Sequence, residues 1–232
     1  MTSPRAADVR LMFTRIARRY DLMNSLMTAG RHHAWRRQLA RAAAAAPPGP
    51  VLDLATGTAD LAIAVRQADP ARHVVGADFS EAMLVEGRPK LIRRGSTRIG
   101  LVAADALVLP FRDRTFAAVA SAFLLRNLED LPRGLGEMRR VTKPGGRVIT
   151  LDIVRPSRPL WGALFGLYFH RVVPALGAAV AGDRTAYTYL PRSVDRFVTP
   201  RELARLMEQA GLSDVTWRTL GLGTVALHTG VA

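Results

Sequence analysis

The architecture of this chain follows from ten residues, Val51-Leu52-Asp53-Leu54-Ala55-Thr56-Gly57-Thr58-Ala59-Asp60. They come after the helix breakers at 47–50 and before 61–68, an apolar segment without breakers. This order predicts a short buried strand, a tight turn and the start of a helix. Small residues at such a turn let a ligand approach the backbone, and the first turn of the helix offers N–H groups that lack a partner.

The turn lacks the features of a phosphate site. A dinucleotide fingerprint would require glycine at positions 55, 57 and 60, where the chain has Ala55, Gly57 and Asp60. The carboxylate of Asp60 would repel a pyrophosphate from the helix N-terminus, and the Lys-Ser/Thr ending of a phosphate-binding loop is missing. The pattern suits a nucleoside without phosphate that carries positive charge. S-adenosylmethionine, a sulfonium, is such a ligand.

A second acid supports this interpretation. Asp78 ends the segment 73–77, which reads as the next strand, and it follows Asp53 by 25 residues. An acid at the end of the second strand can accept hydrogen bonds from both ribose hydroxyls. The alternative is a helix N-cap, although Ser80 can serve as that cap too. The joint presence of the glycine turn and the strand-end acid favours a cofactor site.

Composition indicates an ordinary globular protein. The chain has 232 residues, of which 49% are hydrophobic, and no cysteine, which excludes disulfides, zinc-thiolate sites and cysteine nucleophiles. The start lacks the apolar region of a signal peptide, so we expect a cytoplasmic protein. The net charge of +14 favours acidic partners, but the arginines are dispersed and no nucleic-acid recognition motif occurs. We therefore expect no specific nucleic-acid partner.

The chain reads as one domain, residues 1–232, with a helical arm at about 1–46 and a helical lid insertion at about 155–198. In the arm we expect an amphipathic helix at 6–19, ended by 20–24, and a second helix at 34–46. Strands then alternate with helices, the pattern of a mainly parallel sheet covered on both faces. We place strands at 50–54, 73–77, 99–103, 116–121, 146–152, 213–219 and 223–231, and helices at 58–68, 80–93, 130–141 and 201–210.

A series of short, different motifs follows in order over most of the chain. They are Met12-Phe13, Ile16-Ala17, Tyr20-Asp21, Asn24, Gly30, Trp35-Arg36, Asp53-Leu54-Ala55, Gly57-Thr58, Asp60, Met83-Leu84, Leu109-Pro110-Phe111, Leu125-Arg126-Asn127, 140–147, Tyr189-Leu190, Ser193, Val225-Ala226, His228 and Gly230. This set resembles the signatures of the ubiquinone/menaquinone biosynthesis C-methyltransferase family, which is demethylmenaquinone methyltransferase-like. The Lys-Pro-Gly-Gly turn at 143–146 is generic to methyltransferases, whereas Leu-Arg-Asn with the opening and closing signatures is specific.

The resemblance implies an α/β class I methyltransferase (Rossmann-like) fold. Its sheet has seven strands, mainly parallel, with one antiparallel strand near the edge and helices on both faces. The implied reaction moves a methyl group from S-adenosylmethionine to a ring carbon of a prenylated quinol, a demethylmenaquinol or ubiquinol precursor, and leaves S-adenosylhomocysteine. Asp78 would bind the ribose, and Asp105 and Ala106 would meet the adenine. The predicted cofactor-binding residues are Asp53, Ala55, Gly57, Thr58, Asp78, Phe79, Asp105, Ala106 and Ala122.

Three positions depart from the family pattern. Ala59 stands where a glycine normally closes the cofactor loop, and its Cβ disfavours positive φ. Ala122 replaces a serine that helps to hold the cofactor. Leu124 replaces a glycine before Leu125-Arg126-Asn127 and fills space near the expected acceptor. The first two bear on cofactor affinity, and the third bears on which acceptor fits.

Methyl transfer to a ring carbon needs a neighbouring phenolate and close positioning. The resemblance makes Arg126 and Asn127 the catalytic candidates and Tyr20, Leu124, Tyr189 and His228 pocket candidates. From the residues alone, a surface salt bridge with Glu129 or Asp130 is the favoured role of Arg126. The reaction needs no metal, and His32 and His33 should point apart on a helix.

Two other functions remain open. One is methylation of another aromatic or polyketide acceptor, which Leu124 favours. The other is a protein of this fold that binds without methylating, which Ala59 and the charge favour. The apolar stretch 159–182 is split by His170-Arg171 into halves too short to span a bilayer, so we expect peripheral membrane contact. The sequence leaves a homodimer open.

Overall fold

The structure is a computed structural model that describes residues 4–181 and 184–232. Its centre is a seven-stranded sheet in the order β3-β2-β1-β4-β5-β7-β6. The strands are β1 (Val51–Leu54), β2 (Val74–Asp78), β3 (Ile99–Ala103), β4 (Phe116–Ala122), β5 (Thr142–Ile153), β6 (Ser213–Leu220) and β7 (Val225–Val231). β3, β2, β1, β4 and β5 pair in parallel, and β7 is antiparallel to both β5 and β6. This confirms the expected sheet with one antiparallel strand near the edge.

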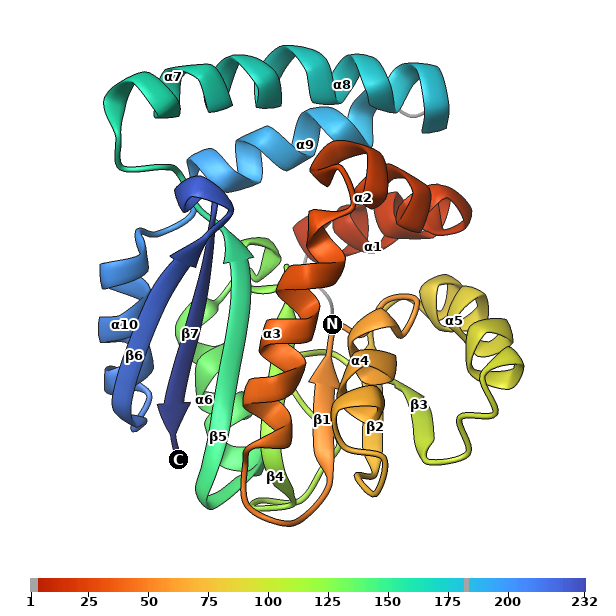
Figure 1. Ribbon diagram of the computed structural model, residues 1–232, viewed down its shortest axis with the longest axis vertical. Coiled ribbons are helices and arrows are strands. Elements are labelled where there is room, and N and C mark those ends of the chain that lie inside the picture. Colours follow the sequence, from red (N-terminus) through yellow and green to blue (C-terminus); the bar gives the residue numbers. More distant parts are fainter. Residues whose placement is uncertain (1–3, 182–183) are drawn as a thin grey trace.

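Helices cover both faces of the sheet (Figure 1). One face carries α3 (Arg31–Ala44), α4 (Asp60–Ala68) and α5 (Glu81–Arg93), which share an apolar core with the strands. The other carries α6 (Leu131–Val141) and α10 (Pro200–Gln209) over a second core. Short 3-10 turns, η2 (Leu125–Asn127) and η5 (Gly221–Gly223), follow β4 and β6. β1, β2 and β4 are accordingly almost continuously apolar, whereas the edge strand β6 is polar and largely exposed.

The N-terminal arm differs from the sequence prediction. It consists of α1 (Pro4–Ile16), the 3-10 turn η1 (Ala17–Arg19) and α2 (Tyr20–Thr28), followed by α3. Residues 20–24 were expected to end a helix but begin α2 instead, because they contain no breaker. The break falls at Ala29 and Gly30, whose φ angles of 47° and 72° are left-handed, and α3 starts at once at Arg31.

The insertion after β5 is a long rod and a returning helix. The rod is formed by α7 (Pro159–Leu167), η3 (Tyr168–Val172), α8 (Val173–Leu176) and η4 (Gly177–Ala181), where η3 and η4 are π-helical. α9 (Arg184–Asp195) runs beneath it (Figure 1). His170 and Arg171, which divide the apolar stretch in the sequence, lie within helical turns and do not interrupt the rod. By length and composition alone, Pro159–Val180 is a helix that could cross a membrane, and 22% of its most apolar window is buried.

The arm and the insertion meet in a third apolar core. Its buried residues are Val9, Met12, Ile16, Met23, Phe169, Val173, Ala186, Tyr187 and Val194. Figure 1 shows this cover (α1, α2 and the insertion, 159–195) above the carboxyl ends of the parallel strands. Ligands of open α/β sheets bind at that end. The cover thus encloses the region where the sequence places its candidate residues.

Candidate functional site

The turn after β1 has the tight shape that the sequence predicts. Ala55, Gly57 and Ala59 have φ angles of 58°, 55° and 67°, all left-handed. Alanine at such an angle costs on the order of 1 kcal/mol or more. Ala59 therefore keeps the conformation expected of the family's glycine and stores strain in doing so. The small side chains leave the backbone accessible to a ligand.

Two buried acids support this turn. Asp53 accepts hydrogen bonds through Oδ2 from Thr56 Oγ1 at 2.6 Å and from the Ala62 N–H at 2.8 Å. Burial raises its pKa to about 7, although these two hydrogen bonds oppose the shift. Its Oδ1 is buried and has no hydrogen-bond partner among the described residues. A buried carboxylate with a spare acceptor fits a ligand that brings a cationic donor, as S-adenosylmethionine does.

Asp78 ends β2 and also faces the turn. Its Oδ2 accepts from the Gly57 N–H at 2.8 Å, and its Oδ1 accepts from the Ser80 N–H at 2.9 Å. Burial raises its pKa to about 6, against the effect of those N–H groups. Each carboxylate oxygen has a further acceptor position, so both can still take a hydroxyl. The assignment of Asp78 to the ribose stays a prediction, and this geometry allows it.

The arm closes over the turn from above. Thr58 Oγ1 donates to Asp21 Oδ1 at 2.7 Å and accepts from Lys90 Nζ at 2.8 Å. Lys90 also forms ion pairs with Asp21 and, at 2.8 Å, with Asp60. Side chains of α2 and α5 thereby meet on one hydroxyl of the cofactor loop, and Lys90 links them to Asp60 of α4. We call these four residues, Asp21, Thr58, Asp60 and Lys90, the latch. The sequence predicts Thr58 as a loop residue but gives no signal for its partners.

The remaining predicted cofactor residues lie at neighbouring strand ends. Phe79 packs edge-on against Phe13 of the arm, with ring centroids 6.4 Å apart. Asp105 is exposed after β3 and accepts the Leu107 N–H at 2.9 Å, the geometry of a turn residue. Ala106 is buried beside it, and half-buried Ala122 ends β4. The structure therefore gathers all nine predicted residues at the carboxyl ends of four adjacent strands.

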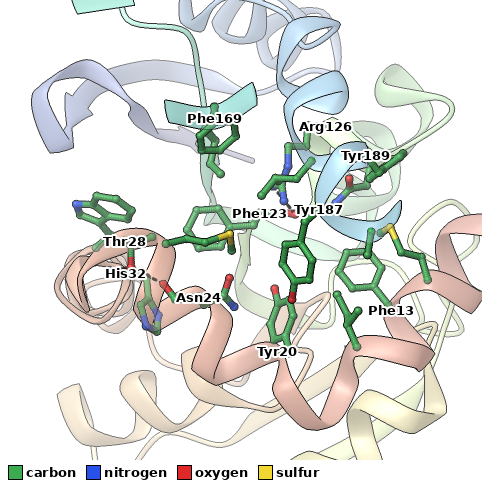
Figure 2. A pocket seen from close by; sticks show the side chains of 18 residues that line it. Phe13, Tyr20, Asn24, Thr28, His32, Phe123, Arg126, Phe169, Tyr187 and Tyr189 are labelled. Atoms are coloured by element: carbon green, nitrogen blue, oxygen red, sulfur yellow. Dashed lines mark hydrogen bonds between the residues drawn. The ribbon is translucent and has the colours of Figure 1, made fainter. Parts of the chain in front are cut away.

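A cavity of about 70 Å³ lies between the cover and the strand ends (Figure 2). The described residues that line it are Met12, Phe13, Ile16, Tyr20, Asn24, Met27, Thr28, His32, Trp35, Phe123, Arg126, Asn127, Ile153, Phe169, Ala186, Tyr187, Tyr189 and Leu190. Most are apolar or aromatic, as expected for a site that takes an apolar ring. Tyr20, Tyr189, Arg126 and Asn127 are thus brought together as predicted.

Two other pocket candidates lie elsewhere. Leu124 does not line this cavity; it packs in the core under α6 and α10. His228 is buried on the same face of the sheet, where its Nε2 lies 2.9 Å from the carbonyl oxygen of Pro200. Burial lowers the pKa of His228. Phe123, whose left-handed φ of 65° turns the chain after β4, takes the place on the cavity wall expected of Leu124.

Arg126 forms a buried ion pair, not a surface one. Its Nη1 lies 2.6 Å from Asp152 Oδ1, and both side chains are less than a tenth exposed. The same nitrogen donates to the Phe123 carbonyl at 2.8 Å, and the Arg126 N–H donates to Asp152 Oδ2 at 3.2 Å. Asp130 instead caps α6 through the Arg133 N–H. The sequence offered one signal for Asp152, an acid within the apolar strand 148–153.

His32 and His33 do not point apart. Their ring centroids are 3.9 Å apart, and their nitrogens lie within 4.8 Å of an Asp60 oxygen, as in a metal site. However, His32 Nδ1 contacts Arg36, its Nε2 lies 3.1 Å from Ser25 Oγ, and Arg36 pairs with Asp60 at 3.6 Å. Burial and then Arg36 lower the pKa of His32 to about 4. A cation would have to displace Arg36, so the cluster is better suited to holding α3 than to binding a metal.

Comparisons with known proteins agree with this geometry. The profile of the ubiE/COQ5 methyltransferase family matches residues 1–232. A demethylmenaquinone methyltransferase of Roseiflexus castenholzii is 44% identical over 98% of this chain and 94% of its own. A demethylmenaquinone methyltransferase of Thermus thermophilus is 43% identical over 94% of this chain and 99% of its own. The ubiquinone/menaquinone biosynthesis C-methyltransferase UbiE of Desulfotalea psychrophila is 42% identical over 96% of this chain and 89% of its own.

Solved structures show the same fold at low sequence identity. A SAM-dependent methyltransferase of Thermotoga maritima superposes with a TM-score of 0.66 at 19% identity, covering 95% of this chain and 97% of its own. The [4+2]-cyclase SpnF superposes with a TM-score of 0.67 at 18% identity, covering 86% of this chain and 80% of its own. The near full-length similarity to the curated relatives decides the family. The chain belongs to the ubiE/COQ5 methyltransferase family and is a SAM-dependent methyltransferase of the class I fold.

Proposed function

We propose that this enzyme methylates a ring carbon of a prenylated quinol, a demethylmenaquinol or ubiquinol precursor. The observation that carries the proposal is the aromatic-lined cavity between the cover and the cofactor turn, with Arg126 and Asn127 in its wall. The names of the curated relatives support the choice of acceptor. S-adenosylmethionine, when bound, supplies an electrophilic methyl group and leaves as S-adenosylhomocysteine.

The chain's own residues bind and orient. Asp78 would hold the ribose and the spare oxygen of Asp53 would accept from the cationic end of the cofactor, while the small residues of the turn allow close approach. Aromatic walls hold the acceptor ring. The phenol next to the reacting carbon gives its proton to a water molecule, and Arg126 stabilises the phenolate, because a guanidinium does not itself take up the proton. The ring carbon gains the methyl group, and its own proton then leaves to water as the ring regains aromaticity. Asp152 fixes the position of that guanidinium.

The test is incubation with S-adenosylmethionine and reduced demethylated quinones in detergent, with the product read by mass. We expect one added methyl group on the ring and equal turnover in the presence of a chelator, since we propose that no metal takes part. Methylation of other aromatic acceptors with none of the quinols would favour the alternative acceptor class. Tight cofactor binding without any transfer would favour a protein that does not methylate.

Arg126 needs a variant that removes the whole ion pair. Arg126→Ala alone would leave Asp152 buried and unpaired, which costs several kcal/mol and endangers the fold. Arg126→Ala combined with Asp152→Asn removes both charges and leaves neither unpaired, and the wild type is the control. We expect the double variant to bind cofactor normally and to turn over on the order of 100-fold more slowly than the control. Equal turnover in the two would assign Arg126 to structure only.

We also propose that the rod docks on a membrane surface. Leu160, Leu164 and Leu167 are 78%, 52% and 60% exposed, and their spacing places them on one face of α7. So many large apolar side chains on one exposed helix face mark an interaction surface. Arg158 lies just before the rod and Arg171 within it; both are exposed and can meet anionic headgroups. A prenylated acceptor resides in the bilayer, so docking there would bring the cavity to its substrate.

A further inference from the structure

The cavity contains more polar groups than Arg126 and Asn127. Buried atoms without a hydrogen-bond partner among the described residues include Asn24 Nδ2, Asn127 Oδ1 and the Tyr189 hydroxyl, and all three residues line the cavity. Buried polar atoms are nearly always hydrogen-bonded in folded proteins. Three such atoms in one small cavity therefore point to a ligand that supplies their partners.

Asn24 comes from a different wall than Asn127. It lies on α2, one helical turn after Tyr20 and one turn before Thr28, so the three side chains share a face. Figure 2 shows Asn24 and Tyr20 on the arm side of the cavity, and Arg126 and Tyr189 on the opposite side. Asn127 lies in η2 at the end of β4, where its Nδ2 donates to the Phe123 carbonyl at 3.1 Å. Its amide is thereby oriented with Oδ1 as the free acceptor.

A free donor on one wall and a free acceptor on the other match a ring with oxygens at opposite positions. We propose that Asn24 donates to one ring oxygen of the quinol while Asn127 accepts from the hydroxyl on the far side. The pair then fixes the ring in its plane and decides which carbon faces the methyl donor. This deepens the proposed function and rests on it. Asn24 is a binding residue that touches the substrate and takes no proton.

The test compares two acceptors in the wild type and in two variants of Asn24. One acceptor is a 1,4-dihydroxy ring, and the other lacks the hydroxyl expected to meet Asn24. In the wild type we expect the second acceptor to lose roughly ten-fold in kcat/KM, the usual worth of a neutral hydrogen bond. In Asn24→Ala the two acceptors should differ little, because the partner is already gone. Asn24→Asp keeps the size but replaces the donor with an acceptor, so it should not restore the preference.

Two controls separate this inference from a general defect. Leu26→Ala alters an exposed residue of the same helix and should leave both acceptors as in the wild type. Melting temperature and cofactor affinity should be equal in Asn24→Ala and the wild type. Titration of the quinol by calorimetry gives a readout that does not need turnover.

The outcomes distinguish the two claims. Quinol binding that weakens in Asn24→Ala, without methylation by the wild type, would sustain the role of Asn24 and overturn the proposed function. Methylation by the wild type, with the same acceptor preference in Asn24→Ala, would overturn the role of Asn24 alone. Absence of both quinol binding and methylation would overturn both.

Discussion

Asp78 makes cofactor binding sensitive to pH. Burial raises its pKa to about 6, and only the ionised carboxylate can accept hydrogen bonds from both ribose hydroxyls. As pH falls through 6 the folded protein takes up a proton there, so we expect affinity for S-adenosylmethionine to fall, approaching ten-fold for each further pH unit. Calorimetry between pH 5 and pH 8 measures this dependence. The range extends from about one pH unit below the pKa of Asp78 to about two units above it.

Asp78→Asn is the matched variant. It should bind more weakly at pH 8 by roughly ten-fold or more, since hydrogen bonds to a charged acceptor are lost. Its affinity should also fall less steeply below pH 6 than that of the wild type, since the remaining fall comes from Asp53, whose pKa burial raises to about 7. An affinity in Asp78→Asn that still falls through pH 6 as in the wild type would remove Asp78 from the ribose site.

Individual residues show how far sequence reasoning reaches. The turn after β1 and the strand-end acids are local features, because breakers, small residues and a short apolar run lie next to one another in the chain. The pairing of Arg126 with Asp152 is not local: the partners are 26 positions apart and meet only because β4 and β5 are neighbours. Sequence therefore identified Arg126 but supplied the wrong partners for it.

At the scale of elements, the latch joins three helices to the cofactor loop. Lys90 on α5 contacts Thr58, Asp60 on α4 and Asp21 on α2, and its side chain is 19% exposed. Opening the arm over the turn requires these contacts to break. The latch therefore contributes to the barrier for cofactor exchange.

Lys90→Met should speed cofactor release. Partly exposed ion pairs contribute up to about 1 kcal/mol, so we expect release to become roughly five-fold faster. Stopped-flow displacement of bound S-adenosylmethionine by excess S-adenosylhomocysteine measures the rate. Arg88→Met, an exposed position on the same helix, is the control and should release as the wild type does. Equal rates in all three proteins would mean that the arm does not control exchange.

The elements were predicted unevenly for physical reasons. β1, β2 and β4 are buried within the sheet, so each stands out as an apolar run, whereas the exposed edge strand β6 contains no such run. Helix ends in the arm depend on Ala29, whose left-handed φ of 47° no propensity foretells. The apolar stretch 159–182 was expected to be too short to span a bilayer because His170 and Arg171 divide it. Yet a helix on the surface accommodates polar residues by turning them outward, and His170 pairs with Asp195 of α9 at 3.1 Å.

At the scale of the whole molecule, the exposed rod predicts binding to vesicles. We expect the protein to float with vesicles of anionic lipid at low salt, and less so at high salt, since charge attraction is screened. Replacing Leu160, Leu164 and Leu167 with Gln should abolish flotation. Ile92→Gln, at a residue 79% exposed on α5, is the control and should float. A wild type that stays at the bottom of the gradient at low salt would show that the rod does not dock on lipid.

The separate core of the cover has a consequence for how such enzymes diversify. The sheet buries its two faces under its own helices, whereas the cover packs around Met23, Phe169 and Val173, which belong to neither of those cores. The cover is thus close to an exchangeable module. Grafting the arm and the insertion of a relative onto this sheet would alter acceptor choice together, as one inherited unit, while the strand-end acids that hold the methyl donor stay the same.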